Sequence, residues 1–294
     1  MTSNRHCVGL SLDIQAAFDS ITPNTIKAAL LKHGGDPQLV QWYYNYLIHR
    51  NLITTIQNDT FTASNAIGFP QGGVVSADFW KIAFNPALEI INSNLTTGFG
   101  YADDLMILRH GYKPEASVNA IQTILNRLIN WGETCNLKFN PTKTLMIIFS
   151  SKKTTPKSTI PLKINDQDVT TVNSIRYLGV TLDSKLSWDQ HRNITIQNAK
   201  QNLVAISQKI AKTWGPKPHI SKWIYTGIIR PKILYASMNW GHTLNTKKVK
   251  DQYDKLNRIA LHMITPCRKS ISTASLEIIY DLLPLPLMLS LIHI

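Results

Sequence analysis

The chain has 294 residues, of which 44% are hydrophobic, so it is long enough to bury a sizeable core as one or two domains. Lys and Arg number 31 against 18 Asp and Glu, and the net charge of +13 favours a polyanionic partner, with an ordinary basic protein as the alternative. Three cysteines without a CxxC pair argue against a disulfide scaffold and indicate a reducing, intracellular setting, nucleus or cytoplasm.

Targeting and metal signals are weak throughout the sequence. The nine histidines show no zinc-ligand spacing, so we expect no structural zinc. No apolar run approaches the roughly 18 residues that a membrane helix needs, and the N-terminus carries no signal peptide. We therefore expect no membrane association and no secretion.

The first predicted element is a strand over residues 7–14, with Asp13 near its end. An acid that closes an apolar strand is either the cap of a following helix or a metal ligand, and the residues favour neither. Phe18 follows five residues later. A helical turn after Asp13 would return this ring to the pocket of the carboxylate, although ordinary core packing is the simpler interpretation.

Two helices are predicted next. Thr22 and Pro23 form a helix start, and this helix should run to about Lys32. Asp36 should cap a second helix that reaches about Arg50, and we interpret the two glycines before it as punctuation rather than a nucleotide motif. The second helix carries an apolar stripe that we interpret as packing, formed by Leu39, Trp42, Tyr43, Tyr46 and Leu47.

A strand pair and a glycine-rich loop follow. Residues 52–57 and 60–63 predict two strands that turn at Asn58 and Asp59. The segment 67–80, IGFPQGGVVSADFW, predicts a loop that enters a helix at Ser76 and continues to about Asn92. Glycines before a helix N-terminus can accommodate a nucleotide, but such loops are common and the signal alone is weak.

The tetrad Tyr101–Asp104, YADD, lies between two short apolar stretches and predicts a β-hairpin with the acidic pair at its tip. In a regular strand Asp103 and Asp104 would point to opposite faces, so they share a site only if the chain turns there. Adjacent carboxylates repel one another unless a cation binds, and Mg²⁺ prefers oxygen ligands. A two-metal site for phosphoryl transfer needs a further carboxylate from another strand.

An amphipathic pattern over residues 114–134 predicts a helix, and residues 137–150 predict a turn that leads into a strand. Lys143 lies at this turn and is either a solvated loop cation or a charge directed at phosphate. Residues 151–158 are polar and basic, which predicts an exposed loop.

The second half of the chain is predicted to be mostly helical. Residues 175–188 predict a hairpin that leads into a helix near Asp189, and helical patterns follow at 190–213, 219–240, 246–264 and 275–281. Cations alternate with aromatic residues here, which suits phosphate contacts and base stacking as well as it suits a solvated helical face. The members are Lys209, Lys212, Trp214, Lys217, Lys222, Trp223, Tyr225, Arg230 and Lys232.

In this order, the strand with its acid, the PQG loop, the YADD hairpin, the lysine turn and the YLG hairpin resemble the palm of a reverse transcriptase. The residues of these motifs are similar to those of reverse transcriptases from non-LTR retrotransposons of the jockey-like branch, and the resemblance extends over nearly the whole chain. The resemblance implies an α+β fold, with a ferredoxin-like antiparallel palm over residues 1–185 and a mostly α-helical thumb and connection over 186–294. It implies an RNA-directed DNA polymerase that extends a DNA primer on an RNA template with dNTPs.

The resemblance also assigns roles to individual residues. Asp13, Asp103 and Asp104 correspond to the catalytic acids that bind two Mg²⁺ ions, with Mn²⁺ as an alternative, and Asp13 and Asp103 are the principal ligands. Lys143 corresponds to the lysine proposed to protonate pyrophosphate, and Phe18 to the aromatic gate against a ribose 2′-hydroxyl. Further substrate-binding positions are Gln71, Gly72 and Tyr101, and the primer grip corresponds to Tyr177, Leu178 and Gly179.

Several features depart from the family pattern. Gly73 and Ala77 stand where Ser and Pro are usual, and we expect both to be tolerated because Ser76 still caps the helix. The chain begins shortly before Asp13, so we expect a truncated copy that lacks most of the fingers and any endonuclease or RNase H domain.

Two alternatives accompany the polymerase hypothesis. The first is an inactive remnant that still binds nucleic acid, favoured by the missing fingers and opposed by the intact acids. The second is another palm-fold enzyme, such as a DNA-templated polymerase or a cyclase, which the PQG and YADD motifs disfavour.

Overall fold

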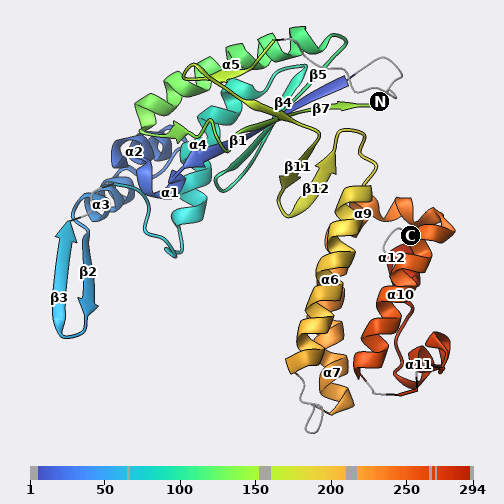
Figure 1. Ribbon diagram of the computed structural model, residues 1–294. Helices are drawn as coiled ribbons and strands as arrows, with labels where there is room; N and C mark the ends of the chain where they lie inside the picture. Colours follow the sequence, from blue (N-terminus) through green and yellow to red (C-terminus); the bar gives the residue numbers. More distant parts are fainter. Residues whose placement is uncertain are drawn as a thin grey trace. The chain divides into compact units, whose positions relative to one another are not determined.

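The structure is a computed structural model that describes residues 6–64, 67–151, 160–209, 217–264, 267–268 and 270–291. It contains two compact units, Met1–Leu178 and Gly179–Ile294 (Figure 1). The first unit combines a β-sheet with helices, and the described part of the second consists of helices after one strand. The predicted α+β class is therefore confirmed.

The main sheet of the first unit has six strands. Their order is β10-β7-β1-β5-β4, and the short β6 pairs with the end of β1. β1 is antiparallel to both β5 and β7, so it is hydrogen-bonded along both edges and its apolar residues are buried. The bounds are β1 His6–Gln15, β4 Thr96–Tyr101, β5 Asp104–Gly111, β6 Lys138–Phe139, β7 Leu145–Ser150 and β10 Thr170–Val172.

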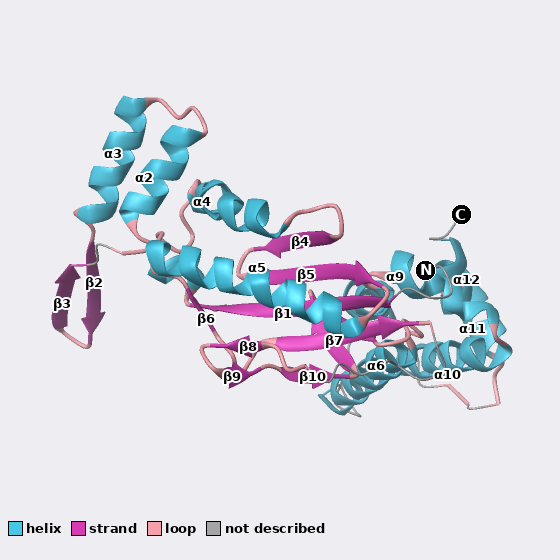
Figure 2. Cartoon of the chain, turned by 90° about the horizontal axis from the view of Figure 1, so that it is seen from above, coloured by secondary structure: helices cyan, strands magenta, loops and turns pink. Residues whose placement is uncertain are grey.

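Helices cover one face of this sheet. α5 runs across the strands, where it contacts β1 and β5, while α4 lies beside it and contacts β4 (Figure 2). Val118, Ile121, Leu125 and Leu128 recur at the helical period on α5 and are fully buried in the core, as the sequence pattern predicts. The helices of the unit are α1 Ala17–Ser20, α2 Pro23–Lys32, α3 Pro37–Ile48, α4 Ser76–Ile91 and α5 Pro114–Cys135.

The caps predicted for α2 and α3 are confirmed. The Thr22 side chain accepts a hydrogen bond from the Thr25 amide, and the Asp36 carboxylate accepts from the Gln38 and Leu39 amides. In each case a side-chain oxygen satisfies amides that have no partner within the helix.

The packing stripe predicted on α3 is wrong in part. Tyr43 and Leu47 are buried against the core, whereas Leu39, Trp42 and Tyr46 are 68%, 66% and 45% exposed. α3 packs against α2. A helix buries only the face that meets its neighbour, so apolar periodicity overstates how many of its residues are covered.

Among the described residues, three two-stranded sheets lie outside the main sheet. β2 and β3 form the predicted antiparallel hairpin, and all of its residues are exposed. β11 and β12 form the hairpin predicted before α6, and the boundary between the two units falls at its turn. The bounds are β2 Asn51–Ile56, β3 Asp59–Ser64, β8 Lys163–Ile164, β9 Gln167–Asp168, β11 Ser174–Tyr177 and β12 Val180–Asp183.

The second unit is built around α10, which packs against α6 and α12. The predicted helix over 219–240 is broken, because Ala236 has a φ of 54°, in the left-handed region that a right-handed helix cannot continue through. The elements are α6 Asp189–Lys209, α7 Pro218–Ile224, the π-helix η1 Tyr225–Ile229, α8 Arg230–Leu234, α9 Ser237–Trp240, the 3-10 helix η2 Gly241–Asn245, α10 Lys247–Ile264, α11 Thr273–Ile279 and α12 Leu285–Leu291.

The predicted cation and aromatic surface of this unit needs correction. Tyr225 and Arg230 are buried, and the Arg230 guanidinium lies over the Tyr225 ring and donates to the Leu283 carbonyl. Both residues therefore belong to the core rather than to a nucleic-acid surface. Lys212, Trp214 and residues 152–158 lie outside the described residues. Within the described ranges, no helix is long and apolar enough to span a membrane.

Candidate active site

The YADD tetrad forms the tip of the β4–β5 hairpin, as predicted. Tyr101 pairs with Asp104 across the two strands, so Ala102 and Asp103 make a two-residue turn. Ala102 has a φ of 53°. A positive φ at the first residue of such a turn matches the twist of the strands that it joins.

The register of the sheet brings the first acid to the same place. Asp13 on β1 is directly opposite Asp104 on β5. Residues in this relation have Cβ atoms roughly 4.5 to 5.5 Å apart and share one face of the sheet. Burial and then the negative charges of Asp103 and Asp13 raise the pKa of the Asp104 carboxyl. The three predicted acids are therefore close enough to repel one another.

The three acids are candidate ligands for a divalent cation. Within the described residues, no group of three or more His, Cys, Asp or Glu side chains is placed to hold a metal ion. The donor chemistry nevertheless fits a hard divalent cation, because the acids offer carboxylate oxygens alone. The repulsion that raises the pKa of Asp104 is the interaction that a bound cation would relieve.

Lys143 lies beside the first acid. Its Nζ is 3.8 Å from Asp13 Oδ2, and its side chain is 68% exposed. The turn that carries it is fastened to β1, since the Asn140 amide donates to the Asp13 carbonyl at 2.9 Å and Thr144 Oγ1 donates to the Asn140 carbonyl at 2.7 Å. Lys143 thus presents a solvent-accessible cation at the acids, and Asn140 is a supporting residue that the sequence analysis did not single out.

Phe18 is partly buried and packs against the core. Its ring stacks on Trp80 with centroids 4.8 Å apart and meets Phe69 edge-on at 6.3 Å. The indole Nε1 of Trp80 in turn donates to the Ala102 carbonyl at 2.8 Å. Phe18 is therefore a core residue that is separated from the acidic turn by one side chain, that of Trp80. Core packing and a place beside the acids are thus compatible interpretations of Phe18.

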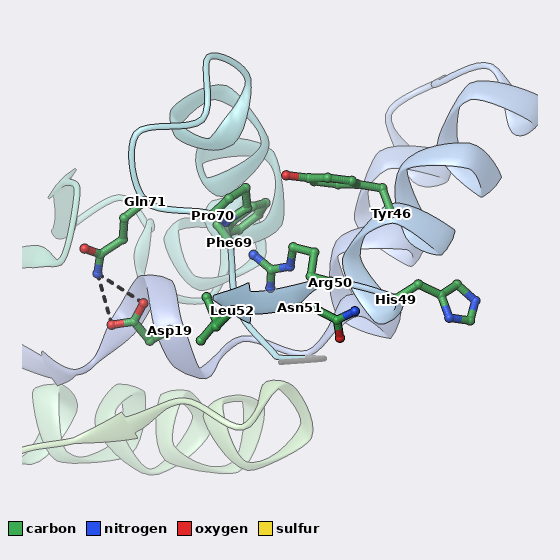
Figure 3. A pocket seen from close by; sticks show the side chains of 9 residues that line it. All are labelled: Asp19, Tyr46, His49, Arg50, Asn51, Leu52, Phe69, Pro70 and Gln71. Atoms are coloured by element: carbon green, nitrogen blue, oxygen red, sulfur yellow. Dashed lines mark hydrogen bonds between the residues drawn. The ribbon is translucent and has the colours of Figure 1, made fainter. Parts of the chain in front are cut away.

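The PQG loop docks on the segment that follows Asp13. The Phe69 amide donates to the Phe18 carbonyl at 2.7 Å, and the side-chain amide of Gln71 donates to both carboxylate oxygens of Asp19 at 3.1 Å (Figure 3). Gly68 has a φ of 79°, and a Cβ there would lie 2.6 Å from the Asp19 Cα. Only glycine fits this close approach. Asp19 is a supporting residue that the sequence analysis did not single out, although it directly follows Phe18.

Ser76 does not cap α4, contrary to the prediction. The N-cap is Val75, which makes no side-chain bond, while Ser76 Oγ donates to the Pro70 carbonyl at 2.9 Å. A Cβ on Gly73 would lie 2.5 Å from Ser76 Oγ. The absence of Ser at position 73 is therefore explained by the space that the Ser76 hydroxyl occupies as it holds the loop.

A hollow of about 780 Å³ opens beside the PQG loop (Figure 3). The Arg50 guanidinium at its edge donates to the Ile67 and Gly68 carbonyls at 3.0 and 2.8 Å, so this cation holds the loop in place. The lining residues are Asp19, Tyr46, His49, Arg50, Asn51, Leu52, Phe69, Pro70 and Gln71.

The remaining predicted residues differ in their relation to the acids. Tyr177 donates to the Phe99 carbonyl at 3.4 Å, and burial and then the charge of Asp104 raise the pKa of its hydroxyl. Tyr101 is 66% exposed on β4. Leu178 has a φ of 45° at the end of the first unit, and Gly179 has a φ of 80° at the start of the second. Within the YLG segment, Tyr177 thus bonds to the strand that leads into the acidic turn and lies near enough to Asp104 for its charge to act on the hydroxyl.

Residues 1–182 match the family described as reverse transcriptase (RNA-dependent DNA polymerase). Because the match covers more than half of the chain, the chain belongs to the reverse transcriptase family. The predicted resemblance to non-LTR retrotransposon enzymes is confirmed by the relatives described next.

The curated relatives are proteins of transposable elements. The chain is 21% identical to a Pol polyprotein from the type-1 retrotransposable element R1 of Nasonia vitripennis, over 74% of the chain and 65% of the relative. It is 26% identical to the RNA-directed DNA polymerase from mobile element jockey of Drosophila melanogaster, over 82% of the chain and 26% of the relative. The chain thus spans less than two thirds of the length of either relative.

Among solved structures, the chain is similar to a telomerase from Candida albicans in complex with a fragment of telomeric RNA. The TM-score is 0.49 at 10% identity, and the match covers 95% of this chain and 51% of the telomerase.

Proposed function

We propose that this chain catalyses RNA-directed DNA synthesis, in which a DNA primer is extended on an RNA template with dNTPs. The observation that supports this proposal most strongly is the register of Asp13 opposite Asp104, with Asp103 in the adjoining turn, in a chain of the reverse transcriptase family. We assign residues 1–185 to the palm and 186–294 to a helical thumb and connection.

We infer that the acids hold Mg²⁺, or Mn²⁺ in its place, through Asp13 and Asp103, with Asp104 beside them. Two such ions, when bound, would activate the primer 3′-hydroxyl and neutralise charge on the transferring phosphoryl group. The raised pKa of Asp104 supports this inference, because mutually repelling carboxylates favour a cation.

The other residues hold the substrate and move a proton. Lys143, an exposed ammonium beside Asp13, donates a proton to the pyrophosphate oxygen as the bond to the α-phosphate breaks. Phe18 excludes a ribose 2′-hydroxyl by its bulk, and Gln71, Gly72 and Tyr101 contact the incoming nucleotide. Tyr177, Leu178 and Gly179 hold the primer end.

Primer extension tests the proposal. A labelled DNA primer on an RNA template is incubated with the chain, Mg²⁺ and dNTPs, beside the Asp103→Asn variant. We expect extension by the wild type and a loss of more than about 100-fold in the variant, because a metal ligand is removed.

Binding of the same primer and template is measured in parallel over a salt series. A chain that binds with a steep salt dependence but extends no primer would be the nucleic-acid-binding remnant. Equal extension by Asp103→Asn and wild type would remove the assignment of the acids.

A further inference from the structure

We propose that Trp80 is a positioning residue that fixes the acidic turn, and with it the direction of the Asp103 side chain. The inference rests on the proposed function only in what it says about metal binding. Trp80 lies in the first half of α4 and is 3% exposed. Its Nε1 donates to the Ala102 carbonyl at 2.8 Å, so a buried side chain of α4 is joined directly to the tip of the β4–β5 hairpin.

The hydrogen bond acts on the peptide that leads into Asp103. The carbonyl of Ala102 and the amide of Asp103 belong to one planar peptide unit. The last pair of the β4–β5 ladder is Tyr101 with Asp104, so Ala102 and Asp103 lie in the turn beyond it. When the indole holds the carbonyl, the plane of this peptide is fixed, and the Asp103 Cα is fixed with it. The pairing of Asp104 with Tyr101 holds the chain on the other side of Asp103, so little rotation remains to turn its side chain.

The indole itself is held firmly by its neighbours. Phe18 stacks on it with centroids 4.8 Å apart and an interplanar angle of 28°, and Phe84 stacks on it at 5.2 Å and 15°. Trp131 packs edge-on against Phe84 at 5.7 Å, which extends the aromatic row to α5. An indole offers one donor and no acceptor, so this row aims a single N–H at the turn.

The same indole serves two proposed roles. It supports the Phe18 ring, which we assign to nucleotide selection, and it holds the turn of Asp103, which we assign to metal binding. Substitution separates these roles. Trp80→Phe keeps an aromatic ring for Phe18 to stack on and removes the N–H, whereas Trp80→Leu removes both.

Hydrogen exchange of the metal-free full chain is the first measurement. We expect Trp80→Phe to accelerate amide exchange in the segment 101–104, while the rest of the sheet keeps its protection. Trp42→Phe is the matched control, because Trp42 is 66% exposed on α3 of the same unit and stacks on Tyr46 rather than on a residue of the turn. Unchanged exchange at the turn in Trp80→Phe would overturn the proposal.

The second measurement is Mn²⁺ binding, followed by electron paramagnetic resonance. We expect about tenfold weaker binding by Trp80→Phe, since removing a group that orients a metal ligand commonly weakens binding by 10 to 100-fold. In primer extension kcat should fall, with little change in the KM for dNTP. A lower melting temperature with unchanged exchange at the turn and unchanged Mn²⁺ binding would make Trp80 a packing residue only and contradict the proposal.

The two measurements distinguish the positioning role of Trp80 from the proposed metal-dependent polymerase function. If the wild type binds no Mn²⁺ but Trp80→Phe still loosens the turn, the structural coupling stands and the metal-dependent function fails. If wild type and Trp80→Phe bind Mn²⁺ equally and exchange equally, the function stands and the role of Trp80 fails.

Discussion

Asp104 in the first unit is an exposed carboxylate and Asp183 in the second is half-buried, and their surroundings shift the two pKa values in opposite directions. Asp104 faces Asp13 across the sheet, and burial and like charges raise its pKa. Burial alone would raise the pKa of Asp183 too, but hydrogen bonds from the Ser187, Trp188 and Lys185 amides outweigh burial and lower it. An acid surrounded by hydrogen-bond donors stabilises the fold, whereas an acid placed among other acids is repelled by them and favours a bound cation.

Substitution of Asp183 should have the largest effect on stability, and it tests the contrast with Asp104. Its carboxylate also accepts from the Ser187 hydroxyl at 3.2 Å, and together these bonds order the turn before α6. Asp183→Ala should lower the free energy of unfolding by about 2 kcal/mol, because amides at a helix entry lose a charged acceptor. Chemical denaturation measures the loss, and Asp183→Asn, which keeps one oxygen acceptor, should lose less.

The pH dependence at Asp183 has a defined sign. A folded-state pKa below the unfolded value means that the contribution is present above the unfolded pKa and is lost as pH falls through the folded pKa. The stability difference between wild type and Asp183→Ala should therefore shrink below about pH 4. A difference that does not change with pH would show that the carboxylate charge is not responsible.

Asp19 is an acid that we expect to act on nucleotide binding through another side chain, that of Gln71. Its carboxylate accepts both hydrogen bonds from the Gln71 amide. Asp19→Ala should raise the KM for dNTP about fivefold, roughly the loss of one hydrogen bond of about 1 kcal/mol, with a smaller change in kcat. Steady-state primer extension gives both constants. Asp19→Asn keeps one oxygen acceptor, so its KM for dNTP should lie between those of the wild type and Asp19→Ala. An unchanged KM in Asp19→Ala would show that Asp19 does not position Gln71 for nucleotide binding.

The smallest expected effect is a gain in stability at Asp104. Asp104→Asn should raise the melting temperature of the metal-free chain at pH 7 by about 1 °C, because the repulsion is removed but water already screens much of it. A raised folded-state pKa gives a contribution that is present below the unfolded pKa and lost as pH rises, so the advantage of Asp104→Asn should vanish below about pH 4.

Asp166→Asn is the control for this measurement, since Asp166 is an exposed residue of the same unit. It should melt with the wild type at both pH values. A lower melting temperature for Asp104→Asn than for the wild type at neutral pH would contradict the claim that neighbouring acids destabilise Asp104, in contrast to Asp183.

Local chemistry made much of the fold predictable. Thr22 and Asp36 each precede a proline and supply a capping oxygen, and the acidic pair between two apolar strands predicts a hairpin tip, so these elements agree with the structure. The strand of Asp13 was equally clear. Signals of this kind depend on neighbouring residues only.

Other features depend on contacts between distant segments. The register that sets Asp13 against Asp104 could not be derived from the residues themselves, and the family resemblance supplied only the expectation that these acids share one site. The bond from Trp80 to Ala102 is a tertiary contact with no local signal. Ser76 was mistaken for a cap because its hydroxyl has a partner elsewhere, in the Pro70 carbonyl.

Primer extension on an RNA template over a Mg²⁺ series tests the central claim most directly. We expect extension by the wild type to rise with Mg²⁺ to saturation. We expect Asp103→Asn to extend no primer at any Mg²⁺ concentration, although it folds and binds the primer and template. Extension by Asp103→Asn with the same Mg²⁺ dependence as the wild type would contradict the claim that the acids at the end of β1 and in the β4–β5 turn form the polymerase site.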